Sequence, residues 1–216
     1  MAMKRSVKKH VPPPPDPNLP ARDRLIIAGG AVFSVQGYSG ASVREICKLA
    51  GTGSNMIHHY FGSKQGLYDE ILSGFSERLF VVPIRIISEP ATNRENLMAR
   101  LEIFLVETLE ALIAQQELYR LVIREQIIFE VFETYNAQLV KFLDAAKEIG
   151  IVRAELDSEM LTGLILDRLG NQILFAPWIS ETSGQNIMSG GTFKKRWLKA
   201  NLDLILHGIL NSGNSG

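Results

Sequence analysis

The chain has 216 residues, of which 46% are hydrophobic and 21% are charged, so it can form a buried core and is not globally disordered. A single cysteine, Cys47, excludes a disulfide framework and a cysteine-cluster metal site, and it fits a reducing compartment. The sequence shows no apolar secretory segment and no run of about 18 apolar residues, so we expect a cytoplasmic protein without a membrane-spanning helix.

The formal net charge of zero conceals an uneven distribution. Residues 1–64 contain nine Lys and Arg side chains and three acidic ones, whereas residues 65–216 contain 14 basic and 20 acidic side chains. A basic head on an acidic body indicates a polyanion-binding module joined to a region with another task.

Residues 1–20 are predicted to form an arm rather than a helix. Four basic residues precede a run of prolines, which cannot continue a helix and favour an extended polyproline-like chain. Such an arm is either a solubilising tail or a segment that contacts DNA phosphates or the minor groove.

The first predicted helix covers residues 21–36 and ends at Gly37. Gly29 and Gly30 lie in its middle and favour the close approach of a neighbouring helix. A second helix begins after Ser42, which forms a capping box with Glu45.

Glycines then separate two further helices, over residues 54–61 and 63–80, and Pro83 helps to end the second of them. The helix that begins after Ser42 and the helix over residues 54–61 are both short and are joined by a glycine turn, which is typical of a helix-turn-helix motif. Amphipathic helices follow from about residue 93, then over 118–129, 131–149, 159–175 and 192–210, with a loop over 177–191 and Thr192 as a helix cap. The predicted fold class is all-α.

Residues 37–68 read GYSGASVREICKLAGTGSNMIHHYFGSKQGLY. An aromatic residue before a Gly-Tyr turn, a Ser-capped helix ending in Ala-Gly, and a Tyr-Phe-x-Ser-Lys exit resemble the DNA-binding region of TetR-family (tetracycline-repressor-like) transcription regulators. The matching positions are Phe33, Gly37, Tyr38, Ser42, Ile46, Ala50, Gly51, Tyr60, Phe61, Ser63 and Lys64. The chain departs from the family pattern at Thr52-Gly53 and at residues 55–58, which leaves the operator sequence open.

The resemblance implies a disordered basic and proline-rich arm (1–20), a three-helix helix-turn-helix DNA-binding domain (21–66) and a helical effector-binding and dimerisation domain (67–216). In the family the last two helices build a homodimer interface, and a ligand pocket lies between the helices of the body.

A recognition helix presents its first residues to base edges and its flanks to phosphates. Asn55 can pair bidentately with adenine, and Tyr60 and Lys64 can bind phosphate oxygens. Ser42 has two possible roles, as a helix cap and as a phosphate contact. The candidate DNA contacts are Ser42, Arg44, Thr52, Gly53, Ser54, Asn55, His59, Tyr60 and Lys64.

Charged side chains interrupt the apolar helix near residue 120. They form either an Arg–Glu pair at a helix surface or polar anchors in an apolar pocket. The candidate ligand-binding residues are Phe104, Arg120, Arg124, Glu125, Phe129, Phe132, Arg168, Gln172 and Phe175.

The sequence thus predicts a ligand-responsive repressor that binds a palindromic operator as a dimer, is released by an apolar or amphipathic effector, and associates with the nucleoid. The alternatives are a constitutive DNA-binding protein without effector and an all-helical enzyme. Three features argue against an enzyme: the chain has only four histidines, it has no Glu-x-x-His di-metal motif, and it has no Walker loop. No metal or cofactor is expected.

Overall fold

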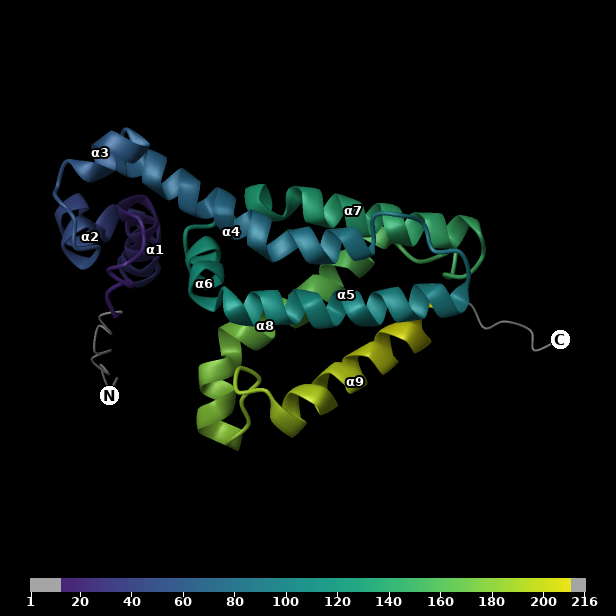
Figure 1. Cartoon of the computed structure of the whole chain (residues 1–216). Coiled ribbons are helices and arrows are strands. Elements are labelled where there is room, and N and C mark those ends of the chain that lie inside the picture. Colours follow the sequence, from purple (N-terminus) through teal and green to yellow (C-terminus); the bar gives the residue numbers. More distant parts are fainter. Residues whose placement is uncertain (1–12, 211–216) are drawn as a thin grey trace. The chain divides into compact units, whose positions relative to one another are not determined.

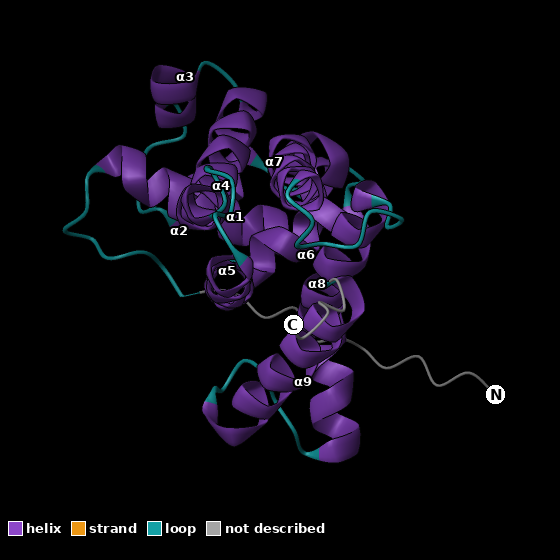
Figure 2. Cartoon of the chain, turned by 90° about the vertical axis from the view of Figure 1, so that its right-hand side faces the viewer, coloured by secondary structure: helices purple, strands orange, loops and turns teal. Residues whose placement is uncertain are grey.

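The computed structural model describes residues 13–210, and within that range the regular structure consists of nine α-helices (Figure 1). The helices are α1 (Ala21–Gly40), α2 (Val43–Leu49), α3 (Met56–Phe61), α4 (Lys64–Ile86), α5 (Arg94–Ala114), α6 (Gln116–Arg124), α7 (Ile128–Glu148), α8 (Ser158–Ser183) and α9 (Gly191–Ile209). Figure 2 shows these helices joined by loops. The described part contains one isolated β-bridge, between Val152 and Leu210, and no strand, which confirms the predicted all-α class.

The described chain divides into two compact units. Unit 1 contains residues 13–75 and 117–128, and unit 2 contains residues 76–116 and 129–210. Helix α4 therefore runs through both units, and α6 belongs almost entirely to unit 1. The expected functional division, with boundaries near residues 20 and 66, stays a prediction, and residues 1–12 of the predicted arm lie outside the described part.

Unit 1 is built around the buried face of α1, where Leu25 and Phe33 are fully buried. A Cβ atom added to Gly29 would lie 2.8 Å from Ile71 Cδ1, so this glycine allows the close approach of α4. Gly37 has φ 76°, a conformation that favours glycine. The predicted helix end at Gly37 is therefore observed as a kink, after which α1 continues to Gly40.

Two predicted helix ends at prolines are wrong. Helix α4 continues past Pro83 to Ile86, and α8 continues past Pro177 to Ser183, which shortens the predicted loop over residues 177–191. A proline removes only its own backbone donor and crowds one carbonyl, so the hydrogen bonds on either side can carry a helix past it.

The predicted helix over residues 118–129 is also wrong at its C-terminal end. Helix α6 ends at Arg124, Gln126 has φ 60°, and α7 begins at Ile128. Apolar residues continue through this turn, and Gln126 is not a residue type that signals a break. Thr192 does not cap α9 either, because the N-cap position is Gly190 and carries no side-chain hydrogen bond.

Unit 2 contains an aromatic cluster of Phe80, Phe104, Phe132 and Tyr135. The ring centroid of Tyr135 lies 4.5 Å from that of Phe80 and 5.4 Å from that of Phe104. The Tyr135 hydroxyl shares a short hydrogen bond with Thr108, whose own hydroxyl bonds to the Phe104 carbonyl at 2.6 Å. Burial raises the pKa of Tyr135 far above its ordinary value, although its bond with Thr108 opposes that shift.

Candidate DNA-binding site

Helices α2 and α3 form the predicted helix-turn-helix. The Ser42 hydroxyl accepts a hydrogen bond of 3.1 Å from the backbone N–H of Glu45, as a helix cap requires. After α2 the chain turns through Gly51 at φ 62°, and the Thr52 N–H donates to the Cys47 carbonyl at 2.9 Å. These bonds fix the turn that leads into α3. The predicted Ser42 cap and the predicted glycine turn of the motif are therefore confirmed.

Helix α3 buries one side and exposes the other. Ile57 is buried, whereas His58, His59 and Tyr60 are exposed. Asn55 occupies the N-cap position of α3 but its side chain makes no capping hydrogen bond. Its amide can therefore contact another group, as a base-reading asparagine must.

The turn before α3 adds further exposed groups. Gly53 and Ser54 are exposed, while Thr52 is half-buried and its hydroxyl lies 3.5 Å from the Cys47 carbonyl. Arg44 and Lys48 are exposed on α2. This short segment therefore carries hydrogen-bond donors and cations. Such groups can bind phosphate oxygens and can form hydrogen bonds with base edges.

Lys64, at the start of α4, is held by an aromatic ring. Its Nζ atom lies 4.4 Å from the ring centroid of Tyr38, a cation–π contact. The Ser63 hydroxyl accepts from the Gly66 N–H at 3.0 Å, which caps the same helix end. The positive end of the helix dipole lies there too, so this end of α4 is suited to bind an anion.

The Tyr38 ring belongs to a second aromatic cluster, made of Phe33, Tyr38 and Tyr68. Its ring centroids are 4.9 to 6.0 Å apart. Burial, and then the charge of Glu125, raise the pKa of Tyr68 to about 12. Tyr68 therefore stays uncharged at neutral pH.

Arg124 and Glu125, which the sequence left open as an ion pair or as pocket anchors, hold α6 against α1. Arg124 Nη2 donates to the Phe33 carbonyl at 2.9 Å, and a Glu125 carboxylate oxygen accepts from the Tyr38 N–H at 3.3 Å. The two side chains are also 3.8 Å apart as an ion pair. A Cβ atom on Gly37 would lie 2.6 Å from Glu125 Oε1, so the kink glycine makes room for this contact.

The other candidate ligand residues have different surroundings. Arg120 belongs to unit 1, whereas Phe104 and Phe132 lie in the aromatic cluster of unit 2. The Phe129 side chain lies outside the described residues. Arg168 donates to Asn201 Oδ1 at 2.8 Å, and Phe175 is 55% exposed. The Gln172 Oε1 atom is buried without a hydrogen-bond partner among the described residues.

The part of the chain that the structure describes, residues 13–210, has neither a membrane-spanning helix nor a metal-binding cluster. No helix in that range is long and apolar enough to cross a membrane. Nor does that range hold a group of three His, Cys, Asp or Glu residues placed to bind a metal ion.

These features define a helix-turn-helix DNA-binding protein. A family profile described as "Bacterial regulatory proteins, tetR family" matches residues 25–71. The chain is 31% identical over 154 residues to the HTH-type transcriptional repressor KstR2 of Mycobacterium tuberculosis, covering 68% of this chain and 76% of the relative. It is 28% identical to the KstR2 repressor of Rhodococcus jostii over 68% of this chain and 74% of the relative. The chain therefore belongs to the tetR family of bacterial regulatory proteins.

Solved structures show the same fold. The ketosteroid transcriptional regulator KstR2 of Mycobacterium tuberculosis superposes with a TM-score of 0.68 at 22% identity, over 93% of this chain and all of that one. A putative fatty acid metabolism regulator of Clostridium perfringens gives 0.69 at 18% identity, over 87% and 99%. The chain is thus a DNA-binding transcriptional regulator of a family whose members bind operator DNA and small-molecule effectors, typically as dimers, and are not enzymes.

Proposed function

We propose that this protein is a cytoplasmic, nucleoid-associated repressor that binds a palindromic operator as a homodimer and leaves it when an effector binds unit 2. The observation that carries the DNA-binding part is the exposed segment around α3, followed by a lysine that Tyr38 holds at the start of α4.

Each candidate contact has a distinct proposed role. Ser54, Asn55 and His59 read base edges in the major groove, because they lie exposed at the start and on the outer side of α3. The remaining residues bind the phosphate backbone and fix the register of the motif. These phosphate contacts are Ser42, Arg44, Thr52, Gly53, Tyr60 and Lys64.

Fluorescence anisotropy with DNA from the region flanking the protein's own gene tests this proposal. We expect specific binding that weakens with salt, and we expect Lys64→Ala to weaken it at least tenfold and to lower the log–log salt slope by about 0.9. Arg85→Ala removes an exposed cation from the last turn of α4 and serves as the matched control. Equal losses in both variants, or binding indifferent to DNA sequence, would contradict the proposed site.

The proposed dimer forms through α8 and α9. Helix α8 exposes Met160, Leu164 and Trp178 at 71%, 64% and 63%, and α9 exposes Leu204 at 56%. A row of large apolar side chains on neighbouring helices is typical of a protein–protein interface. Sedimentation should show a dimer that Leu164→Glu dissociates, whereas Ile149→Glu, at an exposed site at the end of α7, leaves it intact.

The proposed effector is a small apolar or amphipathic molecule. Similar proteins are named as a ketosteroid regulator and as fatty acid regulators, which supports this class. If no molecule of this class, tested at saturating concentration, releases the purified protein from its operator, the constitutive DNA-binding alternative replaces the effector part of the proposal.

A further inference from the structure

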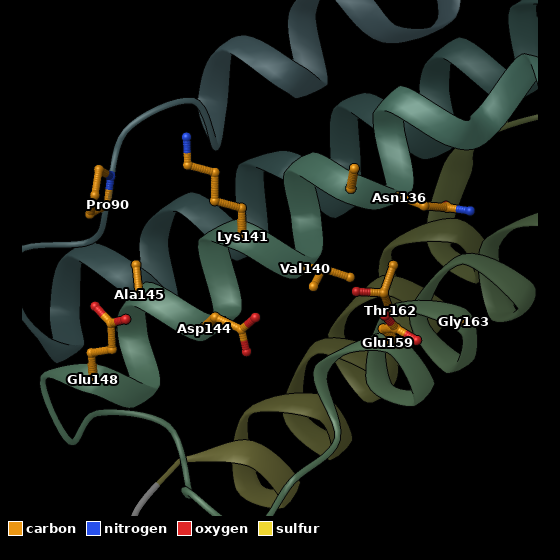
Figure 3. Close-up of a pocket in the computed structure, with 11 residues that line it drawn as sticks. Pro90, Asn136, Val140, Lys141, Asp144, Ala145, Glu148, Glu159, Thr162 and Gly163 are labelled. Atoms are coloured by element: carbon orange, nitrogen blue, oxygen red, sulfur yellow. The ribbon is translucent and has the colours of Figure 1, made fainter.

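A groove of about 800 Å³ lies in unit 2 between α7 and the first turns of α8 (Figure 3). Ala137, Val140 and Ala145 line it from α7, and Pro90 contributes from the segment before α5. This volume falls in the range of small-molecule sites, whose walls are mostly apolar with a few polar groups.

Two residues that line the groove carry buried polar atoms without partners. Thr162 is only 2% exposed, and neither its Oγ1 atom nor Oδ1 of Asn136 has a hydrogen-bond partner among the described residues. Figure 3 shows the Thr162 hydroxyl turned toward Val140 on α7. Burying an oxygen without a partner is unfavourable, and a ligand that donates a hydrogen bond would remove that penalty.

The rim of the groove is acidic. Asp144, Glu148 and Glu159 line it together with a single cation, Lys141. Figure 3 shows the Lys141 ammonium extending away from Asp144 and Glu148. Lys147, 3.5 Å from Asp144 Oδ1, offsets part of one of these charges. The remaining negative charge favours a cation and repels a carboxylate.

We propose that this groove binds an amphipathic organic cation. The three N–H groups of its protonated amine donate to Glu159 and to the oxygens of Thr162 and Asn136, the other rim carboxylates attract its charge, and its apolar body packs on Ala137, Val140 and Ala145. The inference rests on the proposed function in one respect, that unit 2 is the effector-binding unit. Its test does not depend on operator binding, because ligand binding is measured without DNA.

Gly163 provides a way to block the groove. It lines the cavity within α8, and a Cβ atom added to it would meet no atom within 4 Å. The Cβ atom of a leucine at this position therefore has room, its longer side chain is expected to narrow the groove, and helix propensity favours it over glycine.

The test is calorimetric titration with three probes that share one apolar body: 4-phenylbenzylamine, 4-phenylbenzyl alcohol and 4-phenylbenzoate. We expect the amine to bind at least tenfold more tightly than the alcohol, and the benzoate more weakly than either. Equal affinities, or tighter binding of the benzoate, would overturn the proposal.

Variants then locate the binding. Gly163→Leu should weaken amine binding at least tenfold, whereas Ala99→Leu, at an exposed position on α5, should not change it. Thr162→Val should weaken amine binding several-fold and raise the thermal unfolding midpoint, because it removes an unpaired buried hydroxyl. Thr192→Val, at an exposed site, should do neither. Full amine affinity in Gly163→Leu would place the ligand elsewhere and overturn the proposal.

Two further readouts separate this inference from the proposed function. If Gly163→Leu dissociates the dimer, the groove is an interface with a second copy of the chain and the proposal is wrong. If the amine fails to bind while operator binding remains specific, the groove inference fails and the regulator proposal stands. If the amine binds but operator binding is absent, the groove inference stands alone.

Discussion

Each unit of this protein contains an aromatic cluster, and the two clusters differ in what they do with their polar atoms. In unit 1, Tyr38 is half-buried and its ring holds the Lys64 ammonium at the protein surface. In unit 2, Tyr135 is fully buried and its hydroxyl bonds to Thr108 inside the cluster. The first cluster supports a half-buried cation, while the second satisfies its polar atoms internally.

The difference shows that similar aromatic packing can either position a charged group for binding or stabilise a buried core. A cation over a ring keeps its charge available to a phosphate, because the ring takes up none of its hydrogen-bond donors. The buried hydroxyls of Thr108 and Tyr135 bond to each other, so they cannot bind a group in solvent. The experiments below test this contrast, from the largest expected effect to the smallest.

The largest effect is expected for Phe104→Ala in the cluster of unit 2. Phe104 is fully buried, so its removal should lower the free energy of unfolding by about 3–5 kcal/mol. Urea denaturation followed by circular dichroism measures this loss. Phe175→Ala, at a residue that is 55% exposed, is the control and should change stability far less. A small loss for Phe104→Ala would show that the cluster is loosely packed.

The second effect is a pH dependence centred on Tyr68. Between pH 10 and the raised pKa of about 12, the unfolded chain loses this proton while the folded chain keeps it. Stability should therefore fall as the pH rises through this window, by up to about 2–3 kcal/mol. Urea denaturation between pH 9 and 12 should show this fall in the wild type and a smaller one in Tyr68→Phe. Equal slopes in both proteins would show that Tyr68 titrates normally.

The smallest effect separates two N-cap residues of the helix-turn-helix. Ser42 accepts a capping hydrogen bond, so Ser42→Ala should cost about 1 kcal/mol of stability. Asn55 makes no such bond, so Asn55→Ala should leave stability nearly unchanged while weakening operator binding. Thermal unfolding and DNA anisotropy of the same two samples make the comparison. If both variants lose the same stability, Asn55 acts as a helix cap like Ser42, and this outcome would contradict its proposed role in reading a base.

The helix-turn-helix was accessible from the sequence because its signals are local. The Ser42 cap, the Gly37 kink and the glycine turn after α2 each depend on neighbours within a few residues. The family resemblance came from the same segment, whereas the all-α class came from the helical pattern along the whole chain. The helix ends at Pro83 and Pro177 were mispredicted, since the packing around a proline decides whether the helix continues beyond it.

The sequence by itself determined that this chain is all-helical with a helix-turn-helix, because hydrophobic periodicity, caps and glycine turns are local signals. Its role as a DNA-binding regulator came from the resemblance of one contiguous motif to a known family. Only the tertiary structure decided what Arg124 and Glu125 contact, since 87 residues separate Glu125 from Tyr38. It also decided that Lys64 lies over Tyr38 and that Thr162 and Asn136 line one groove. Contacts of this kind depend on which helix faces pack together, and a single sequence does not record that choice.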